Sequence, residues 1–301
     1  MSSTLPDTTP APFPAGGFDA LPPAEVARKA ETVGVAKAGM HTVDMFILAV
    51  LAGAFIALGA IFATTAVAGG GDLPYGVLRL LAGVTFSLGL MLVVVAGAEL
   101  FTGNNLIVMA WASRRVSTGR LLANWTIVWI GNFVGAVATA GIVYVSGQYT
   151  FGDGAVGQTA LSIASAKTSL GFVEAIALGV LCNALVCLAV WLTYGARTTT
   201  DKLLAVVPPI AAFVAAGFEH SVANMYFLSI GLLIKRDEAF VSSLDAAPDL
   251  TGLTWRSMFA DNLLPVTIGN IIGGALLVGA VYWFVFLRGR RSRDVPTASA
   301  R

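Results

Sequence analysis

Apolar residues occur in six long runs, separated by short stretches rich in polar residues, glycine or proline. A helix needs about 20 mostly apolar residues to cross the hydrocarbon of a bilayer. Each run meets that length, so the pattern predicts six membrane-spanning helices. They are expected near residues 44–68, 80–111, 122–147, 171–194, 204–233 and 262–287. The second and fifth runs are unusually long, and each is interrupted by polar residues.

The interruption of the fifth run is the most unusual feature of the pattern. It places Glu219, His220, Ser221 and Asn224 inside a segment long enough to cross a membrane. An ionisable side chain at the bilayer centre costs roughly 3 kcal/mol on insertion scales, and such groups usually face a polar path or one another. The sequence therefore predicts a polar site in the middle of the membrane.

The interruptions of the second and fifth runs match each other. Residues 97–104 and 217–224 both have glycine first, glutamate third and asparagine last. A second match follows one span later, GNFVG at 131–135 and GNIIG at 269–273. Three predicted spans lie in each half, and an odd number inverts the second copy relative to the first. We predict two inverted three-helix repeats with a broken second and fifth helix, a common transporter layout.

Broken helices at this depth suggest an anion path. Non-helical backbone is tolerated inside a membrane only where it is buried or lines a cavity. The N-terminal end of a helix carries free N–H groups and a partial positive charge, which favour anions. No lysine or arginine lies at the centre of any predicted span. Such a path would attract small anions without trapping them.

Composition excludes other classes. The chain is 56% hydrophobic and only 12% charged, whereas soluble domains have about 25% charged residues. The net charge of +1 gives no reason to expect nucleic-acid binding. The two cysteines, Cys182 and Cys187, share one apolar run, so we expect buried thiols and neither a disulfide nor a metal site. We expect no cofactor.

The ends of the chain differ from its centre. Residues 1–23 are rich in proline and lack the basic segment followed by an apolar segment that is typical of a signal peptide. We therefore expect a disordered cytoplasmic tail without a cleavable signal. A helix at the membrane surface is expected over 24–39, a channel domain over 24–287 and a basic tail over 288–301. Basic residues gather in both ends and in the loops after the second and fourth spans. This places both termini in the cytoplasm. The longest loop, 234–261, is expected to form short surface helices.

Three motifs resemble the formate/nitrite transporter family. They are FTGN at 101–104, GFEHSVANM at 217–225 and DNLLPVTIGNIIGG at 261–274. The similarity extends from about residue 24 to 287. It implies an aquaporin-like, all-α fold in the inner membrane, assembled as a homopentamer with one pore per protomer. It also implies passage of formate, nitrite or hydrosulfide.

The resemblance also assigns residue roles. The central pore residues would be His220, Asn183 facing it, and Thr102. The apolar constrictions would be formed by Leu100 and Phe213 on the cytoplasmic side and by Phe86, Leu90 and Val186 on the outer side, with Phe213 shared between them. Vestibule and supporting positions would be Lys167, Glu219, Glu99, Asn104 and Asn224.

Simpler structural roles are weighed for several of these residues. His220 could be a packing histidine that bonds a carbonyl group or Asn183, and Asn183 could join helices through a hydrogen bond. Glu99 and Glu219 would repel an anion, so we expect them to cap freed backbone N–H groups or support a loop. The matched asparagines of the Gly-Asn pairs, Asn132 and Asn270, are expected to serve close helix packing. Lys167 could be an ordinary loop residue or a collector of anions.

Three function classes are compared. We favour a formate channel, with nitrite or hydrosulfide as alternatives, in which a neutral His220 relays a proton to the anion. A water or glycerol channel has a similar architecture, but the paired Asn-Pro-Ala motifs are missing. A hydrolase built on Glu219, His220 and Ser221 lacks both the His-Glu-x-x-His and the Gly-x-Ser-x-Gly pattern. We therefore expect no enzyme activity.

Overall fold

Six helical segments in the computed structural model are long and apolar enough to cross a membrane. They are α2 (Thr42–Val67), α3 (Tyr75–Ala96), α6 (Thr118–Val145), α8 (Phe172–Gly195), α9 (Thr199–Ala216) and the run Trp255–Phe286. The structure describes residues 19–289, and this part of the chain contains no strand. The all-helical class and the six spans are therefore confirmed. The expected tails lie mostly outside the described residues.

The remaining helices are short. They are α1 (Pro23–Gly39), α4 (Phe101–Asn104), η1 (Asn105–Ile107), α5 (Val108–Ala112), η2 (Gln148–Thr150), α7 (Ala155–Thr168), α10 (Ser221–Ile234) and α11 (Glu238–Ser243). The last span consists of α12 (Trp255–Ser257), α13 (Leu264–Ile271), α14 (Val281–Phe286) and two π-helical stretches, η3 (Met258–Leu263) and η4 (Ile272–Ala280).

Two features differ from the sequence prediction. The last span begins at Trp255 rather than near 262, so it includes the end of the predicted loop 234–261. The connection after the third span contains α7, a helix of 14 residues. Its apolar content is too low for a span, which is why the hydropathy pattern did not distinguish it from a loop.

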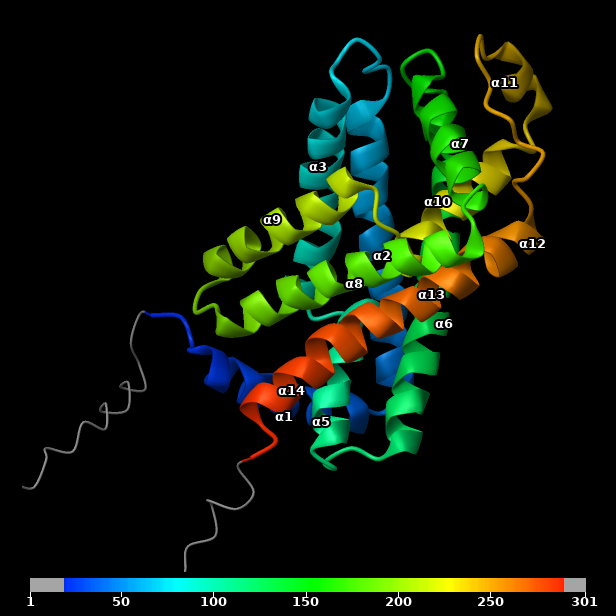
Figure 1. The fold of residues 1–301 in the computed structure, drawn as a ribbon. Coiled ribbons are helices and arrows are strands. Elements are labelled where there is room, and N and C mark those ends of the chain that lie inside the picture. Colours follow the sequence, from blue (N-terminus) through cyan, green and yellow to red (C-terminus); the bar gives the residue numbers. More distant parts are fainter. Residues whose placement is uncertain (1–18, 290–301) are drawn as a thin grey trace, which may run out of the picture.

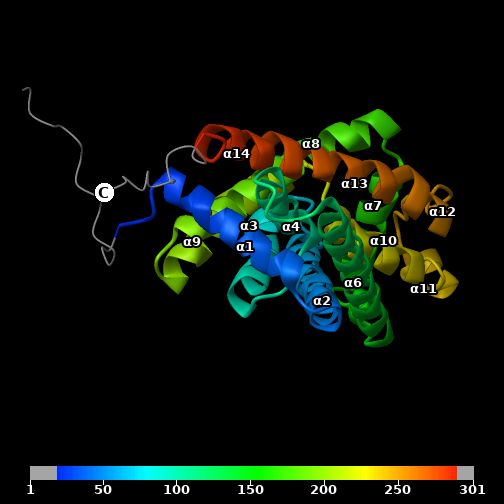
Figure 2. The same ribbon diagram turned by 90° about the horizontal axis from the view of Figure 1, so that it is seen from below.

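Contacts between helices link the two halves of the chain. Helix α2 packs against α3 and α6, and α8 packs against α9 and α13, while α3 also packs against α9. Helices α1 and α14 are in contact and lie with α5 at one end of the molecule, whereas α7 and α11 lie at the other (Figure 1). We call these the terminal face and the distal face. The view in Figure 2 shows α1 lying across the helices at the terminal face.

Glycine allows the closest helix contacts. A Cβ atom added at Gly135 of α6 would overlap the carbonyl group of Val50 in α2, and one added at Gly273 would overlap that of Val180 in α8. Small residues let membrane helices approach closely, so that dispersion contacts hold them together. These glycines belong to the two matched GN-x-x-G motifs, whose glycines thus perform the close packing.

We expect Gly135→Ala to destabilise the protein. Overpacking a tight contact costs typically about 1–3 kcal/mol, and here the added methyl group meets backbone that cannot rotate away. Size-exclusion chromatography after a temperature series should show a lower apparent Tm than for the unmodified protein. Gly141→Ala is the control, because an added Cβ on the same helix meets nothing within 4 Å. Equal melting of the two variants would contradict the prediction.

Candidate functional site

The second and fifth predicted spans are each interrupted by four non-helical residues. Helix α3 ends at Ala96 and α4 begins at Phe101, whereas α9 ends at Ala216 and α10 begins at Ser221. Each helix ends in a glycine with positive φ, +81° at Gly97 and +79° at Gly217. Side chains other than glycine rarely adopt this left-handed conformation. This explains why both matched motifs begin with glycine.

Two asparagines hold the breaks in place. The Asn270 side chain accepts a hydrogen bond from the Ser221 amide and donates one to the Glu219 carbonyl, both at 2.9 Å. Asn132 makes the same pair of bonds, accepting from the Phe101 amide and donating to the Glu99 carbonyl. Each asparagine also donates to a carbonyl group of the helix packed against it, Ala49 in α2 for Asn132 and Gly179 in α8 for Asn270, so the bonds at the breaks add to the expected role in close helix packing. They replace the backbone partners that an unbroken helix would provide.

The same comparison bears on the internal repeat. Corresponding residues of the two halves make corresponding hydrogen bonds, which supports the predicted repeat. The inverted orientation of its two copies stays a prediction.

His220 lies at the junction of the two halves. Its Nδ1 accepts a hydrogen bond from the Ala223 amide at 3.0 Å, so His220 is the N-cap of α10. Its Nε2 lies 2.9 Å from the Thr102 hydroxyl. A ring nitrogen that accepts an N–H carries no proton, so this geometry places the proton of the neutral ring on Nε2. His220 is only 3% exposed and Thr102 is fully buried.

Asn183 lies beside this pair without bonding the histidine. Its side-chain N–H groups donate to the carbonyl groups of Thr102 and Asn270 and to the Asn105 side chain. Among the described residues it has no hydrogen bond to His220, so the alternative in which His220 is a packing histidine bonded to Asn183 is not supported. Asn183 instead joins α8 to α4 and α13, which matches the alternative role of linking helices.

A buried ion pair lies next to His220 on the distal side. Lys167, in the last turn of α7, is 2.8 Å from Glu219. The other carboxylate oxygen of Glu219 accepts from Asn224 at 2.6 Å and from Asn262 at 3.4 Å. Among the described residues the Glu219 carboxylate thus binds side chains and no backbone N–H group, which favours the second expected role, support of the neighbouring loop.

The terminal side has a matching set. Lys37 of α1 is 2.6 Å from Glu99, whose second oxygen accepts from Asn104 at 2.7 Å. Asn104 also donates to Asn124. The sequence pattern did not point to Lys37, Asn124 or Asn262 as site residues. Lys37 lies in the helix predicted at the membrane surface, and only the fold brings it to the matched glutamate.

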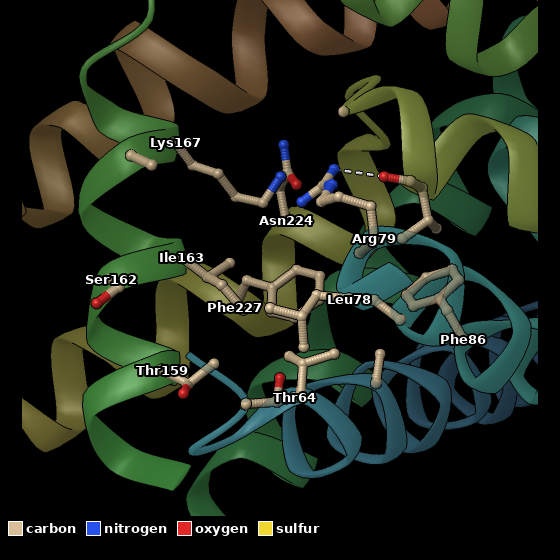
Figure 3. Close-up of a pocket in the computed structure, with 18 of the residues that line it drawn as sticks. Thr64, Leu78, Arg79, Phe86, Thr159, Ser162, Ile163, Lys167, Asn224 and Phe227 are labelled. Atoms are coloured by element: carbon tan, nitrogen blue, oxygen red, sulfur yellow. Dashed lines mark hydrogen bonds between the residues drawn. The ribbon is translucent and has the colours of Figure 1, made fainter. Parts of the chain in front are cut away.

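Two separate cavities approach the Thr102–His220 pair. The distal cavity has a volume of about 760 Å³, and the side chains of Lys167, Arg79 and Asn224 point into it (Figure 3). The terminal cavity has a volume of about 220 Å³ and is lined by Lys37, Glu99 and Asn104 among others. Among residues 19–289, no residue lines both cavities.

The predicted constriction residues are all buried, and most of them line one or the other cavity. Phe86 and Phe213 both line the distal cavity, with ring centroids 5.7 Å apart. Leu90 and Leu100 line the terminal cavity, and Val186 lines neither. Leu90 is one turn along α3 from Phe86, which is why the two residues line different cavities. Their assignment to one constriction stays a prediction.

Comparison with known proteins identifies the family. The model of the formate/nitrite transporter family matches residues 24–284. The chain belongs to the formate/nitrite transporter family. It is thus a multi-pass membrane protein, and the family's curated members similar to it are named as channels and transporters.

Relatives within the formate/nitrite transporter family cover nearly the whole chain. "Formate channel FocA" of Escherichia coli (strain K12) is 47% identical over 275 residues, covering 90% of this chain and 96% of the relative. The protein of the same name from Haemophilus influenzae is 38% identical over 263 residues, covering 86% and 93%. A solved structure described as "Pentameric formate channel with formate bound" superposes with a TM-score of 0.77 at 41% identity, covering 82% of this chain and 98% of that one.

Proposed function

We propose that this protein is a formate channel. The observation that carries the proposal is the buried Thr102–His220 pair, 2.9 Å apart, between two cavities that approach it from opposite faces. Similarity to a family whose curated relatives include formate channels identifies the anion. The pore would run from the distal cavity past Phe86 and Phe213 to this pair, and then past Leu90 and Leu100 to the terminal cavity.

The assembly and placement follow from the same similarity. The solved relative is a pentamer with formate bound, so we expect five copies with one pore each. The lipid bilayer is the second partner. The distribution of basic residues supports an inner-membrane orientation with both termini in the cytoplasm, which makes the distal face the outer one.

The site argues for transport rather than hydrolysis. Both ring nitrogens of His220 bind groups other than the neighbouring Ser221, namely the Ala223 amide and the Thr102 hydroxyl. A serine nucleophile needs a base within hydrogen-bond distance. The arrangement that would make Ser221 reactive is therefore not assembled.

The geometry favours a hydrogen-bonding role for His220 over the expected proton relay. A neutral ring that gave up its Nε2 proton would become an imidazolate, and Nδ1 is occupied by the Ala223 amide. The Nε2–H group can instead donate its hydrogen bond to an arriving anion in place of the Thr102 hydroxyl. Together with the Thr102 hydroxyl it would replace part of the water that the anion loses between Phe86 and Phe213.

His220→Asn should remove most formate flux. Asparagine is a favourable N-cap residue, so the variant keeps a partner for the Ala223 amide and loses only the ring N–H. A hydrogen bond to a charged group contributes roughly 1.5–3 kcal/mol, which corresponds to a fall of about 10-fold or more in flux. Proteoliposomes with the purified protein, compared for formate, nitrite and hydrosulfide at pH 7 and pH 5, provide the measurement.

The pH comparison separates the two roles. A hydrogen-bond donor predicts that His220→Asn has low flux at both pH values with an unchanged ratio between them. A proton relay predicts that the ratio itself collapses to one. Formate flux equal to that of the unmodified protein would contradict both roles. Water permeation without anion flux in the unmodified protein would contradict the proposed function.

A further inference from the structure

Arg79 is a second cation in the distal cavity, besides Lys167. It lies in the second turn of α3, is half-buried and lines the cavity together with Lys167 and Phe227. Figure 3 shows its guanidinium pointing toward the end of the Lys167 side chain. No sequence motif singled out Arg79.

The guanidinium of Arg79 binds the end of a broken helix. Its Nε donates to the Ala215 carbonyl at 3.3 Å, and its terminal nitrogen donates to the Val214 carbonyl. A Cβ atom added at Gly217 would lie 3.4 Å from the same guanidinium. Arg79 therefore covers the point at which α9 stops and the chain turns toward His220.

This position is electrostatically important for an anion. The C-terminal end of a helix carries about half a negative charge, and the end of α9 faces the cavity through which the anion must pass. Carbonyl groups there would repel it. A guanidinium bound to those carbonyl groups cancels the repulsion and leaves positive charge at the cavity wall.

The two cavities differ in net charge because of Arg79. In the terminal cavity Lys37 and Glu99 are the charged lining residues, and they form an ion pair. In the distal cavity Lys167 is paired with Glu219, but within residues 19–289 no carboxylate lies within ion-pair distance of Arg79. The lining of the distal cavity is therefore more positive by one charge.

The matched helix end in the other half has no such partner. The carbonyl groups of Val94 and Val95, which correspond to those of Val214 and Ala215, receive no side-chain hydrogen bond from the described part of the chain. The two halves thus have matching hydrogen bonds at their breaks, but only the second half has an arginine bound to the carbonyl groups at the helix end, within the described residues.

We propose that Arg79 determines how anions are captured from the distal face. By neutralising the end of α9 and making the cavity net positive, it lowers the concentration at which flux from that face saturates. The concentration at which flux from the terminal face saturates does not depend on it. This inference rests on the proposed anion-channel function.

Formate flux measured separately from each face tests the proposal. Right-side-out and inside-out membrane vesicles present opposite faces, and protease cleavage of a C-terminal tag assigns the terminal face. At zero membrane potential and low ionic strength, KM from the distal face should be lower than from the terminal face. Arg79→Gln should raise the distal KM about 3- to 10-fold and leave the terminal KM within about twofold.

Two variants separate charge from mere structural support. Arg79→Lys keeps the charge and should restore most of the low distal KM, although it loses the forked hydrogen bonding. Arg236→Gln removes a positive charge from an exposed residue on the same face and should leave both KM values unchanged. Raising the salt concentration should shrink the effect of Arg79→Gln, because the Debye length falls to about 8 Å at 0.15 M.

Each outcome bears on the proposal. Equal increases in KM for Arg79→Lys and Arg79→Gln, insensitive to salt, would overturn it and leave Arg79 as a helix clamp. Unchanged KM in both variants would also overturn it. An absence of formate flux in the unmodified protein would instead contradict the proposed function. A passive channel has equal kcat/KM from its two faces, and this equality checks the assay in every variant.

Discussion

Replacing Asn270 with leucine should strongly destabilise the protein. Asn270 is fully buried, and its side chain is the partner of the Ser221 amide and the Glu219 carbonyl at the break between α9 and α10. Leucine has a similar volume and can pair with neither group. An unsatisfied buried polar group costs about 1–3 kcal/mol, so the two groups together cost roughly 2–6 kcal/mol. This is a large part of a typical stability of about 5–15 kcal/mol.

Thermal melting in detergent, followed by the fraction of monodisperse oligomer, measures this effect. Ile268→Leu on the same helix is the control, since Ile268 is 37% exposed and apolar. Asn132→Leu should reproduce the defect, because Asn132 makes the same two bonds at the other break. An Asn270→Leu protein that melts with the Ile268→Leu control would show that the break is held by packing alone.

Lys167→Met should lower the free energy of unfolding nearly as much as Asn270→Leu does. Adding Glu219→Gln to Lys167→Met should restore part of that stability. The two side chains form an ion pair at 2.8 Å and are only 14% and 7% exposed. Breaking a buried pair leaves an uncompensated charge and costs roughly 3–5 kcal/mol when the pair is fully enclosed. Here Asn224 and Asn262 still donate to Glu219, so we expect about 2–4 kcal/mol. The double variant removes both charges and should be more stable than Lys167→Met alone.

A double-mutant cycle of apparent stability measures the coupling between Lys167 and Glu219. Arg115→Gln provides the comparison, because the Arg115–Glu31 pair is 2.9 Å long but its arginine is 45% exposed. Exposed pairs contribute about 0–1 kcal/mol. If Lys167→Met lowered the apparent stability no more than Arg115→Gln, solvent would be screening the Lys167–Glu219 pair fully. The burial of that pair would then contribute nothing to stability.

The breaks explain how a polar site can persist inside the membrane. Each break exposes backbone groups that hydrocarbon cannot satisfy. Asn132 and Asn270 satisfy them from neighbouring helices, and the buried ion pairs lie directly beside them. The positive φ of Gly97 and Gly217 turns the chain at these points. Stability and the proposed transport path therefore depend on the same few residues.

The sequence by itself determined the class, the six spans and the positions of the two breaks. These features are local, because the length of an apolar run and a polar interruption within it are read along one segment. It also picked out Glu99, His220 and Glu219 as the unusual polar residues. The role of Asn132 and Asn270 at the breaks was missed, because an asparagine in a helix does not reveal which backbone groups of another helix it faces.

Only the tertiary structure decided which of these residues meet. Thr102 and His220 are far apart in sequence and come together because α4 and α10 begin at one buried junction. Lys37 reaches Glu99 only because α1 packs across the terminal face. The division of the apolar residues between two cavities, and the position of Arg79 at the end of α9, depend on how α3 and α9 pack. The length of an apolar run determines which segment crosses the membrane, whereas contacts between helices depend on packing that no single segment encodes.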